Sequence, residues 1–147
     1  MQIKPPVRSP DSYGAGYFGA SRGSRKHAGV DFACAPGSKI LSPISGLVTK
    51  LGYPYSDDLS FRYVEVTAID NLRYRFFYVD PCVKVGGNVL ANESVLGTSQ
   101  RLGLRYPADA MHAFAITEHI HFEIKALSED YIDPLEMLED LHTLGGA

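Results

Sequence analysis

The sequence contains no tryptophan, only two cysteines, and no apolar run that approaches the ~18 residues of a membrane-spanning helix. Cys34 and Cys82 are too few for a disulfide scaffold; one bridge between them stays open, but we expect two buried, unpaired thiols. Basic residues are not in excess, because the formal net charge is -3, and this argues against a nucleic-acid-binding surface. Residues 1–6 show no apolar h-region, so no secretory signal is visible; a leader removed earlier is the alternative.

What the sequence does contain fits one globular domain of 147 residues, of which 45% are hydrophobic and 21% charged. Residues 1–26 form a loop-rich N-terminal segment in which prolines and glycines are interleaved with aromatic residues. Residues 27–147 form the body of the same domain. Arg22, Arg25 and Lys26 gather near the boundary, and we interpret them as a solvated loop in preference to a substrate-binding patch.

Beyond this segment, short apolar runs alternate with turn residues, which is typical of an antiparallel β-protein. The pattern predicts strands over residues 39–41, 46–51, 61–69 and 73–79. The last two are separated by Asp70-Asn71, as in a β-hairpin.

The second half of the chain predicts one more strand, over residues 119–125, and one helix. Residues 83–98 loosely echo residues 37–52, which hints at an internally duplicated β-motif, and residues 99–117 form a long connection. Asp133 is a suitable N-cap and Pro134 suits the first helical position. The expected helix has one apolar face and a glycine stop, formed by Leu135, Leu138, Leu141 and Gly145-Gly146. The fold class is therefore mostly β, with antiparallel sheet, long loops and one C-terminal helix.

Two of the five histidines, His119 and His121, are separated by one residue inside a strand pattern. Strand side chains alternate between faces, so both imidazoles point to one side, while Ile120, Phe122 and Ile124 fill the other. Imidazole is a good zinc ligand, so the pair suits a metal. The alternative is two surface histidines on a half-exposed strand.

His27 and Asp31 lie four residues apart, which places both on one face of an extended segment. Gly29 between them lets the backbone pass close to another element. Alone, the pair reads as a loop histidine and a turn aspartate. Together with His121 it makes a set of three ligands that leaves a fourth zinc position open, as in catalytic sites. His119 would then stand beside the metal as a candidate base.

These residues resemble the two signature motifs of the lysostaphin-type, or LytM-type, zinc endopeptidases, HxxxD and then HxH much further along the chain. The resemblance covers residues 17–138. It implies a β-fold of the duplicated hybrid motif type, and Zn²⁺ bound by His27, Asp31 and His121 with His119 as a catalytic base. The implied reaction is hydrolysis of peptide cross-links in bacterial peptidoglycan, with water activated by zinc as the nucleophile.

One position departs from the family pattern. The family carries a second catalytic histidine in a Tyr-x-His motif, and the matching stretch Tyr78-Val79-Asp80 ends in Asp80. An ionised aspartate cannot donate a hydrogen bond to an oxyanion. His112, in the loop before the second motif, is our candidate for a further catalytic residue, and Tyr17 or Tyr13 could also reach the site.

The same departure is similar to the vertebrate leukocyte chemotaxin-like proteins, which keep the zinc motifs and are regarded as binding proteins. Two hypotheses follow: a zinc endopeptidase, which we favour, and a zinc-holding binding module without turnover. Glu123 shares the face of His121 and either orients a ligand or is solvated; His142 reads as a helix-terminal surface residue.

We expect a monomer that acts on peptidoglycan in the periplasm or cell wall, binds no nucleic acid and does not insert into membranes. The compact format suits a phage-borne lysin or a tail-associated enzyme.

Overall fold

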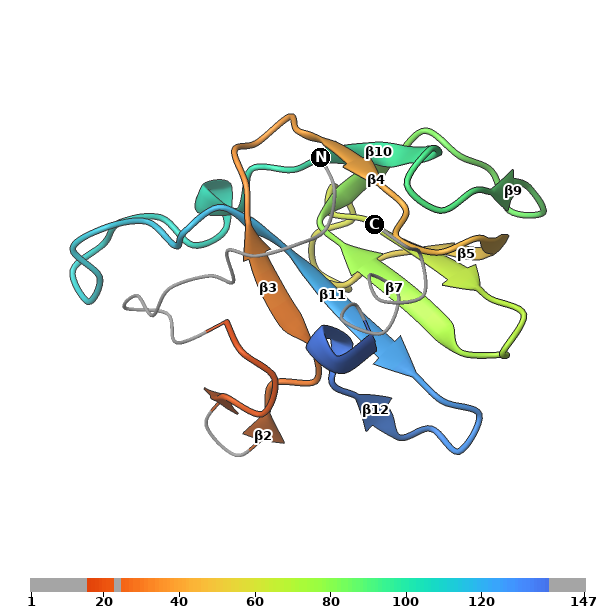
Figure 1. The fold of residues 1–147 in the computed structure, drawn as a ribbon. Coiled ribbons are helices and arrows are strands. Elements are labelled where there is room, and N and C mark those ends of the chain that lie inside the picture. The colour runs from red at the N-terminus through yellow and green to blue at the C-terminus, as the bar shows by residue number, and fades with distance from the viewer. Residues whose placement is uncertain (1–15, 23–24, 138–147) are drawn as a thin grey trace.

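The computed structural model describes residues 16–22 and 25–137. Within these ranges the regular secondary structure consists almost entirely of antiparallel strands, which are joined by long loops (Figure 1). In chain order they are β1 (Ser21–Arg22), β2 (Arg25–Lys26), β3 (Val30–Ala33), β4 (Lys39–Leu41), β5 (Gly46–Gly52), β6 (Tyr63–Thr67), β7 (Arg73–Phe77), β8 (Val79–Pro81), β9 (Asn88–Val89), β10 (Val95–Ser99), β11 (His119–Lys125) and β12 (Tyr131–Ile132). A short 3-10 helix, η1 (Leu102–Leu104), follows β10.

Two sheets form the body of the fold. The larger sheet has the strand order β12-β11-β7-β6-β5-β9, and β3 also pairs with β11. The smaller sheet has the order β4-β10-β8, and β1 and β2 form a separate hairpin. Pairing is antiparallel throughout these strands. The predicted mostly β, antiparallel class is therefore confirmed.

The hydrophobic core contains buried side chains from both sheets, so it lies between them. Ile40 of β4 and Leu96 of β10 meet the apolar face of the larger sheet, where Phe122 of β11 stacks on Phe76 of β7 with ring centroids 4.8 Å apart. The apolar residues that alternate along β11 have no exposed surface, as predicted. The opposite face of the larger sheet carries charged and histidine side chains, together with the stacked rings of Tyr63 and Phe77.

The predicted hairpin is present as β6 and β7, joined at Asp70-Asn71. Asn71 has a φ of 66°, in the left-handed region that asparagine tolerates in turns. The strands are shorter than predicted. In particular, β7 stops before Tyr78, whose φ of 68° breaks the extended chain.

The C-terminal helix begins at Pro134, as predicted. The side chain of Asp133 accepts a hydrogen bond from the backbone N–H of Leu135 at 3.0 Å, which confirms the N-cap. Leu135 packs against the core. The later part of the predicted helix, with Leu138, Leu141, His142 and Gly145-Gly146, lies outside the described residues. Within the described part of the chain, no helix has the length and apolar character needed to cross a membrane.

The two cysteines are unpaired, as expected, but only one is even partly buried. Cys34 is half-buried, whereas Cys82 follows directly after β8 and is exposed, so the prediction of two buried thiols is wrong for Cys82.

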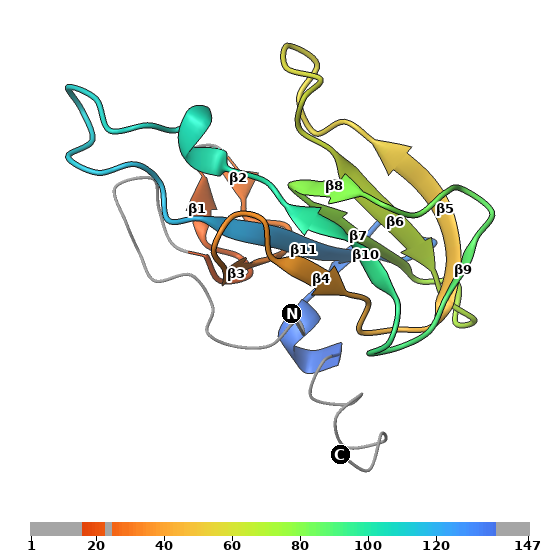
Figure 2. The same cartoon turned by 90° about the horizontal axis from the view of Figure 1, so that it is seen from above.

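The segment between η1 and β11 projects away from both sheets in two perpendicular views (Figures 1 and 2).

The core account predicts a large difference between two phenylalanines. Phe122→Ala should lower the free energy of unfolding by about 3–5 kcal/mol, because it leaves a cavity where the side chain is fully buried. Phe114→Ala, at a site that is 81% exposed, should change it little. Urea denaturation measures both, and equal effects would contradict the placement of the core.

Candidate metal centre

The pairing of β3 with β11 sets the geometry of the site. In this ladder Asp31 lies directly opposite His121, so the two side chains leave the sheet on the same face. Oδ1 of Asp31 lies 3.0 Å from Nδ1 of His121. His119, two residues earlier on β11, belongs to the same face, as its spacing predicted.

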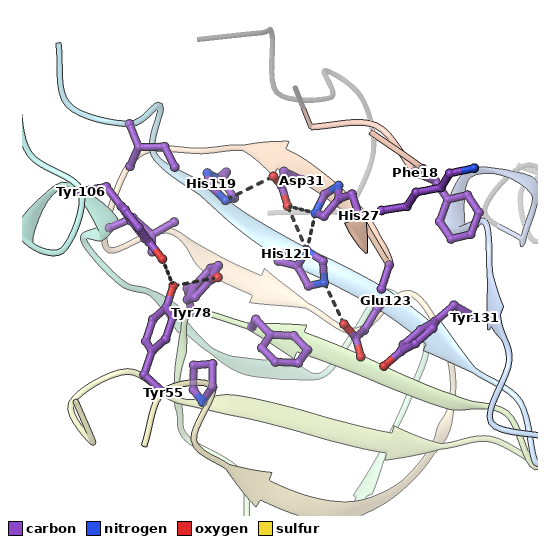
Figure 3. A pocket seen from close by; sticks show the side chains of 17 residues that line it. Phe18, His27, Asp31, Tyr55, Tyr78, Tyr106, His119, His121, Glu123 and Tyr131 are labelled. Atoms are coloured by element: carbon purple, nitrogen blue, oxygen red, sulfur yellow. Dashed lines mark hydrogen bonds and ion pairs between the residues drawn. The ribbon is translucent and has the colours of Figure 1, made fainter. Parts of the chain in front are cut away.

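His27 joins this pair from the loop between β2 and β3. Its Nε2 lies 3.1 Å from Oδ1 of Asp31 and 2.9 Å from Nδ1 of His121. The ligand atoms of the three residues all lie within 4.8 Å of one another. The structure thus brings together the three residues that the sequence predicted as ligands (Figure 3).

Hydrogen bonds outside the group determine which nitrogen of each imidazole faces inward. Nδ1 of His27 donates to the backbone carbonyl of Tyr17 at 3.0 Å, and Nε2 of His121 donates to Oε1 of Glu123 at 2.8 Å. A carbonyl and a carboxylate can only accept, so these nitrogens carry the hydrogens. In the neutral rings, Nε2 of His27 and Nδ1 of His121 therefore present lone pairs to each other and to Asp31.

Three lone-pair atoms at 2.9–3.1 Å repel one another unless a cation or an extra proton lies among them. A tetrahedral zinc ion with ligands at about 2.0–2.1 Å would space such atoms about 3.3 Å apart, close to the observed separations. Two imidazoles and one carboxylate are also a donor set that suits zinc and leaves a fourth position open. The residues therefore fit a zinc site of the catalytic type.

The pKa values of the group reflect the same crowding. Burial lowers the pKa of the His121 imidazole, but its hydrogen bonds to Asp31 and Glu123 outweigh this and raise it to about 9. Burial acts to raise the pKa of the Asp31 carboxyl, but hydrogen bonds from His121 and His27 hold it well below its usual range. Zinc binds only the deprotonated imidazole nitrogen, so binding of the ion would compete with a proton at this position.

Gly29 makes this close approach possible. A Cβ at that position would lie 2.3 Å from the backbone oxygen of Phe122 and 2.9 Å from Cε1 of His121. Only glycine leaves room for the chain that carries His27 to lie against β11. The interpretation of Gly29 from the sequence is therefore confirmed, and β11 is the element that it passes.

Behind His121, buried charges continue across the sheet. Glu123 is 6% exposed and lies 3.5 Å from Nη1 of Arg75. Nε of Arg75 donates to Glu65 at 2.8 Å, and the Thr49 hydroxyl donates to the same carboxylate at 2.8 Å. Strands β11, β7, β6 and β5 each supply one member of this chain, so the sheet itself holds the carboxylate that orients His121. Of the two alternatives for Glu123, the structure supports the ligand-orienting contact.

His119 stands beside the group with its tautomer also fixed. Its Nδ1 donates to the backbone carbonyl of Thr117 at 2.6 Å, so Nε2 carries the lone pair of the neutral ring. Nε2 lies 3.5 Å from Oδ2 of Asp31, and the side chain is buried. This is a suitable position for a base that acts next to a metal.

One cleft, with a volume of about 710 Å³, is lined by the three candidate ligands together with His119 and Glu123. The ligands lie between two groups of aromatic side chains (Figure 3). Phe18 and Tyr131 lie toward one end, and Tyr55 and Tyr106 toward the other. An extended chain could therefore cross the ligands with residues on both sides of them.

Three tyrosines at one end of the cleft were not predicted as a group from the sequence. The Tyr55 hydroxyl lies 2.7 Å from that of Tyr106 and 3.1 Å from that of Tyr78. The Tyr78 ring meets the His119 ring edge to face, with centroids 5.8 Å apart. Burial raises the pKa of Tyr78 to about 12, so its hydroxyl stays protonated at neutral pH. The three lie far apart in the sequence, and no spacing links them.

His112 is not brought to the cleft. Its Nδ1 lies 2.9 Å from Oδ1 of Asp109, in the projecting loop before β11. The same oxygen accepts hydrogen bonds from the backbone N–H groups of Met111 and His112, which closes a compact turn. This turn holds the imidazole away from the residues that line the cleft, in contrast to the expectation from the sequence.

Asp80 does not line the cleft either. It is exposed on β8, and Tyr78, two residues earlier, lines the cleft in its place. Of the other tyrosines considered, Tyr17 contributes its backbone carbonyl to His27 while its side chain is 56% exposed. Tyr13 lies outside the described residues.

The chain is similar to known proteins in sequence and in fold. The family described as "Peptidase family M23" matches residues 25–134. Leukocyte cell-derived chemotaxin-2 of Mus musculus is 31% identical over 117 residues, which cover 80% of this chain and 72% of that protein. The catalytic domain of the antimicrobial peptidase lysostaphin from Staphylococcus simulans is 23% identical with a TM-score of 0.63, covering 86% of this chain and 90% of that one. The structure of LytU is 20% identical with a TM-score of 0.66, covering 95% and 90%. These structures share the fold.

The ligand assignment predicts that His27→Ala and His121→Ala each abolish zinc retention, because two donors cannot hold the ion against dialysis. Elemental analysis of dialysed protein should find about one zinc per wild-type chain. His112→Ala is the matched control and should retain its zinc. Zinc retained by His121→Ala would overturn the assignment.

The contact between Glu123 and His121 predicts a graded effect. Glu123→Ala should weaken zinc binding about 10–100-fold, because the imidazole loses the partner that fixes its orientation. Competition with a chromogenic chelator measures the affinity. Glu129→Ala, which removes an exposed carboxylate, serves as the control. Equal zinc affinity in Glu123→Ala and wild type would contradict the role of Glu123.

Proposed function

Because the chain belongs to peptidase family M23, we propose that it is a zinc-dependent endopeptidase that hydrolyses peptide cross-links of bacterial peptidoglycan. One observation carries the proposal: Nε2 of His27, Oδ1 of Asp31 and Nδ1 of His121 converge with their lone pairs facing inward. This donor set suits zinc and leaves a fourth position for substrate or water. The fold shared with lysostaphin, an antimicrobial peptidase, supports a cell-wall substrate.

The residues of the cleft divide the work of hydrolysis. Zinc, when bound, supplies Lewis-acid chemistry that acidifies water and polarises a carbonyl. Nε2 of His119 accepts the proton of the attacking water, because Nδ1 is committed to the Thr117 carbonyl. Oδ2 of Asp31, 3.5 Å away, stabilises the resulting imidazolium.

Atoms balance over the reaction. The water oxygen forms a bond to the carbonyl carbon, and the carbon–nitrogen bond of the peptide then breaks. The proton held by His119 passes to the departing amine, which leaves a carboxylic acid on the other fragment; at neutral pH this acid ionises and its proton goes to the free amine or to solvent. Aromatic residues on both sides of the ligands suit a substrate that continues in both directions, which favours cleavage within a chain.

A second candidate is a zinc-holding binding module without turnover. The 31% identity to mouse leukocyte cell-derived chemotaxin-2 favours it. So does the composition of the cleft, since its lining within the described residues has no histidine besides His27, His119 and His121. For the endopeptidase, we further propose that the protein acts in the periplasm or cell wall. We propose that it does so as a monomer and that it belongs to a phage lysin.

Incubation of the purified protein with peptidoglycan of several wall chemotypes tests the function. We expect new amino termini to appear, to stop on addition of chelator and to be absent with His121→Ala, while His112→Ala remains active. Mass spectrometry of the released peptides identifies the bond. Stoichiometric zinc binding without release from any chemotype would reject the endopeptidase in favour of the binding module.

A further inference from the structure

Tyr78 enters the cleft through a strained backbone. Its φ is 68°, a left-handed conformation that bulky aromatic residues rarely adopt and that costs about 1–3 kcal/mol. Its N–H donates to the carbonyl of Arg62 at 2.8 Å, and its carbonyl accepts from the N–H of Gln100 at 2.9 Å. Neighbouring segments on both sides therefore hold the residue in this conformation.

The strain redirects the chain where β7 ends. Tyr74 and Phe76 of β7 face the core, so a regular continuation would send Tyr78 into the core as well. Instead Val79 takes that place, with no exposed surface, and Tyr78 lines the cleft. The strained backbone thus brings the Tyr78 side chain into the cleft that the candidate zinc ligands also line, and such backbone outliers cluster at functional sites.

Hydrogen bonds prepare this hydroxyl as a donor. The Tyr55 hydroxyl donates to the Tyr78 hydroxyl at 3.1 Å. Tyr55 has one hydroxyl hydrogen, so in its 2.7 Å contact with Tyr106 it accepts. Tyr78 is thus the acceptor at the end of a chain of two donations, and its own hydrogen is left to bond a group in the cleft. Each donation strengthens the next donor.

The ring of Tyr78 is also placed against the candidate base. It meets the His119 ring edge to face at an interplanar angle of 88°. In Figure 3 it lies between Tyr55 and the group that contains His119, Asp31 and His121. A substrate carbonyl held by the ligands would therefore have His119 and the Tyr78 hydroxyl as neighbours.

We propose that Tyr78 is a catalytic residue that donates a hydrogen bond to the oxyanion formed when water attacks the scissile carbonyl. The inference rests on the proposed function. Hydrolysis places negative charge on the carbonyl oxygen, and a donor aimed at that atom stabilises the transition state. The Tyr78 hydroxyl supplies this donor in a cleft whose described lining lacks a further histidine. Tyr78 forms no covalent bond and keeps its proton throughout.

Tyr78→Phe tests the role, because it keeps the ring and its packing and removes only the hydroxyl. We expect kcat to fall about 10²–10³-fold, with little change in KM and unchanged zinc content, since the bond forms only with the oxyanion. Tyr74→Phe is the matched control, because it removes a buried hydroxyl from the core face of β7 and should leave kcat unchanged. Tyr78→His, which restores a donor, should recover part of the loss.

Binding of a phosphinic peptide, a tetrahedral mimic of the attacked carbonyl, gives a second readout that needs no turnover. Its affinity should fall in Tyr78→Phe by a factor similar to kcat, while a product peptide binds both proteins equally. A kcat and phosphinate affinity equal to wild type would overturn the role of Tyr78. If the wild-type protein hydrolyses no peptidoglycan, the proposed function is rejected. In that event the phosphinic peptide still tests Tyr78, because equal affinity for the wild type and for Tyr78→Phe would reject the hydrogen-bond donor.

Discussion

The register of β3 against β11 is the constraint on which the candidate site depends. It sets Asp31 opposite His121 and at the same time turns Val30 and Phe32 into the core, where neither has exposed surface. A slip of one residue would exchange these faces, which would turn the carboxylate into the apolar core and the apolar side chains toward the cleft. Burial of apolar side chains on one face of the sheet therefore fixes the position of the ligands on the other face. Gly29 has no Cβ, so the segment that carries His27 can lie close to β11.

This arrangement places unfavourable groups where the fold can tolerate them. Three lone-pair atoms face one another, a carboxylate, a guanidinium and a second carboxylate lie buried behind them, and Tyr78 adopts a left-handed backbone. Each feature costs stability by itself. The packed core between the two sheets and the hydrogen bonds around each group hold them in position.

The sequence predicted those parts of the site that follow from local periodicity. Alternation along residues 119–125 placed both histidines on one face, and the spacing of His27 and Asp31 around Gly29 pointed to an extended segment in close contact with another. The convergence of these two motifs was inferred from a family resemblance, because strand pairing between distant segments is not visible in local spacing. The N-cap at Asp133 and the hairpin at Asp70-Asn71 were likewise readable.

The rest of the site depends on single backbone angles and on loops. Whether Tyr78 or Asp80 reaches the cleft is decided by one φ angle at the end of β7, which periodicity does not specify. The position of His112 is decided by a turn around Asp109, and the tyrosine group assembles from three separate segments.

X-ray diffraction at the zinc edge, on crystals grown with the metal, tests the central claim most directly. The account predicts one anomalous peak per chain, about 2.0–2.2 Å from Nε2 of His27, one carboxylate oxygen of Asp31 and Nδ1 of His121. A peak held by other residues, or none at these three, would contradict it.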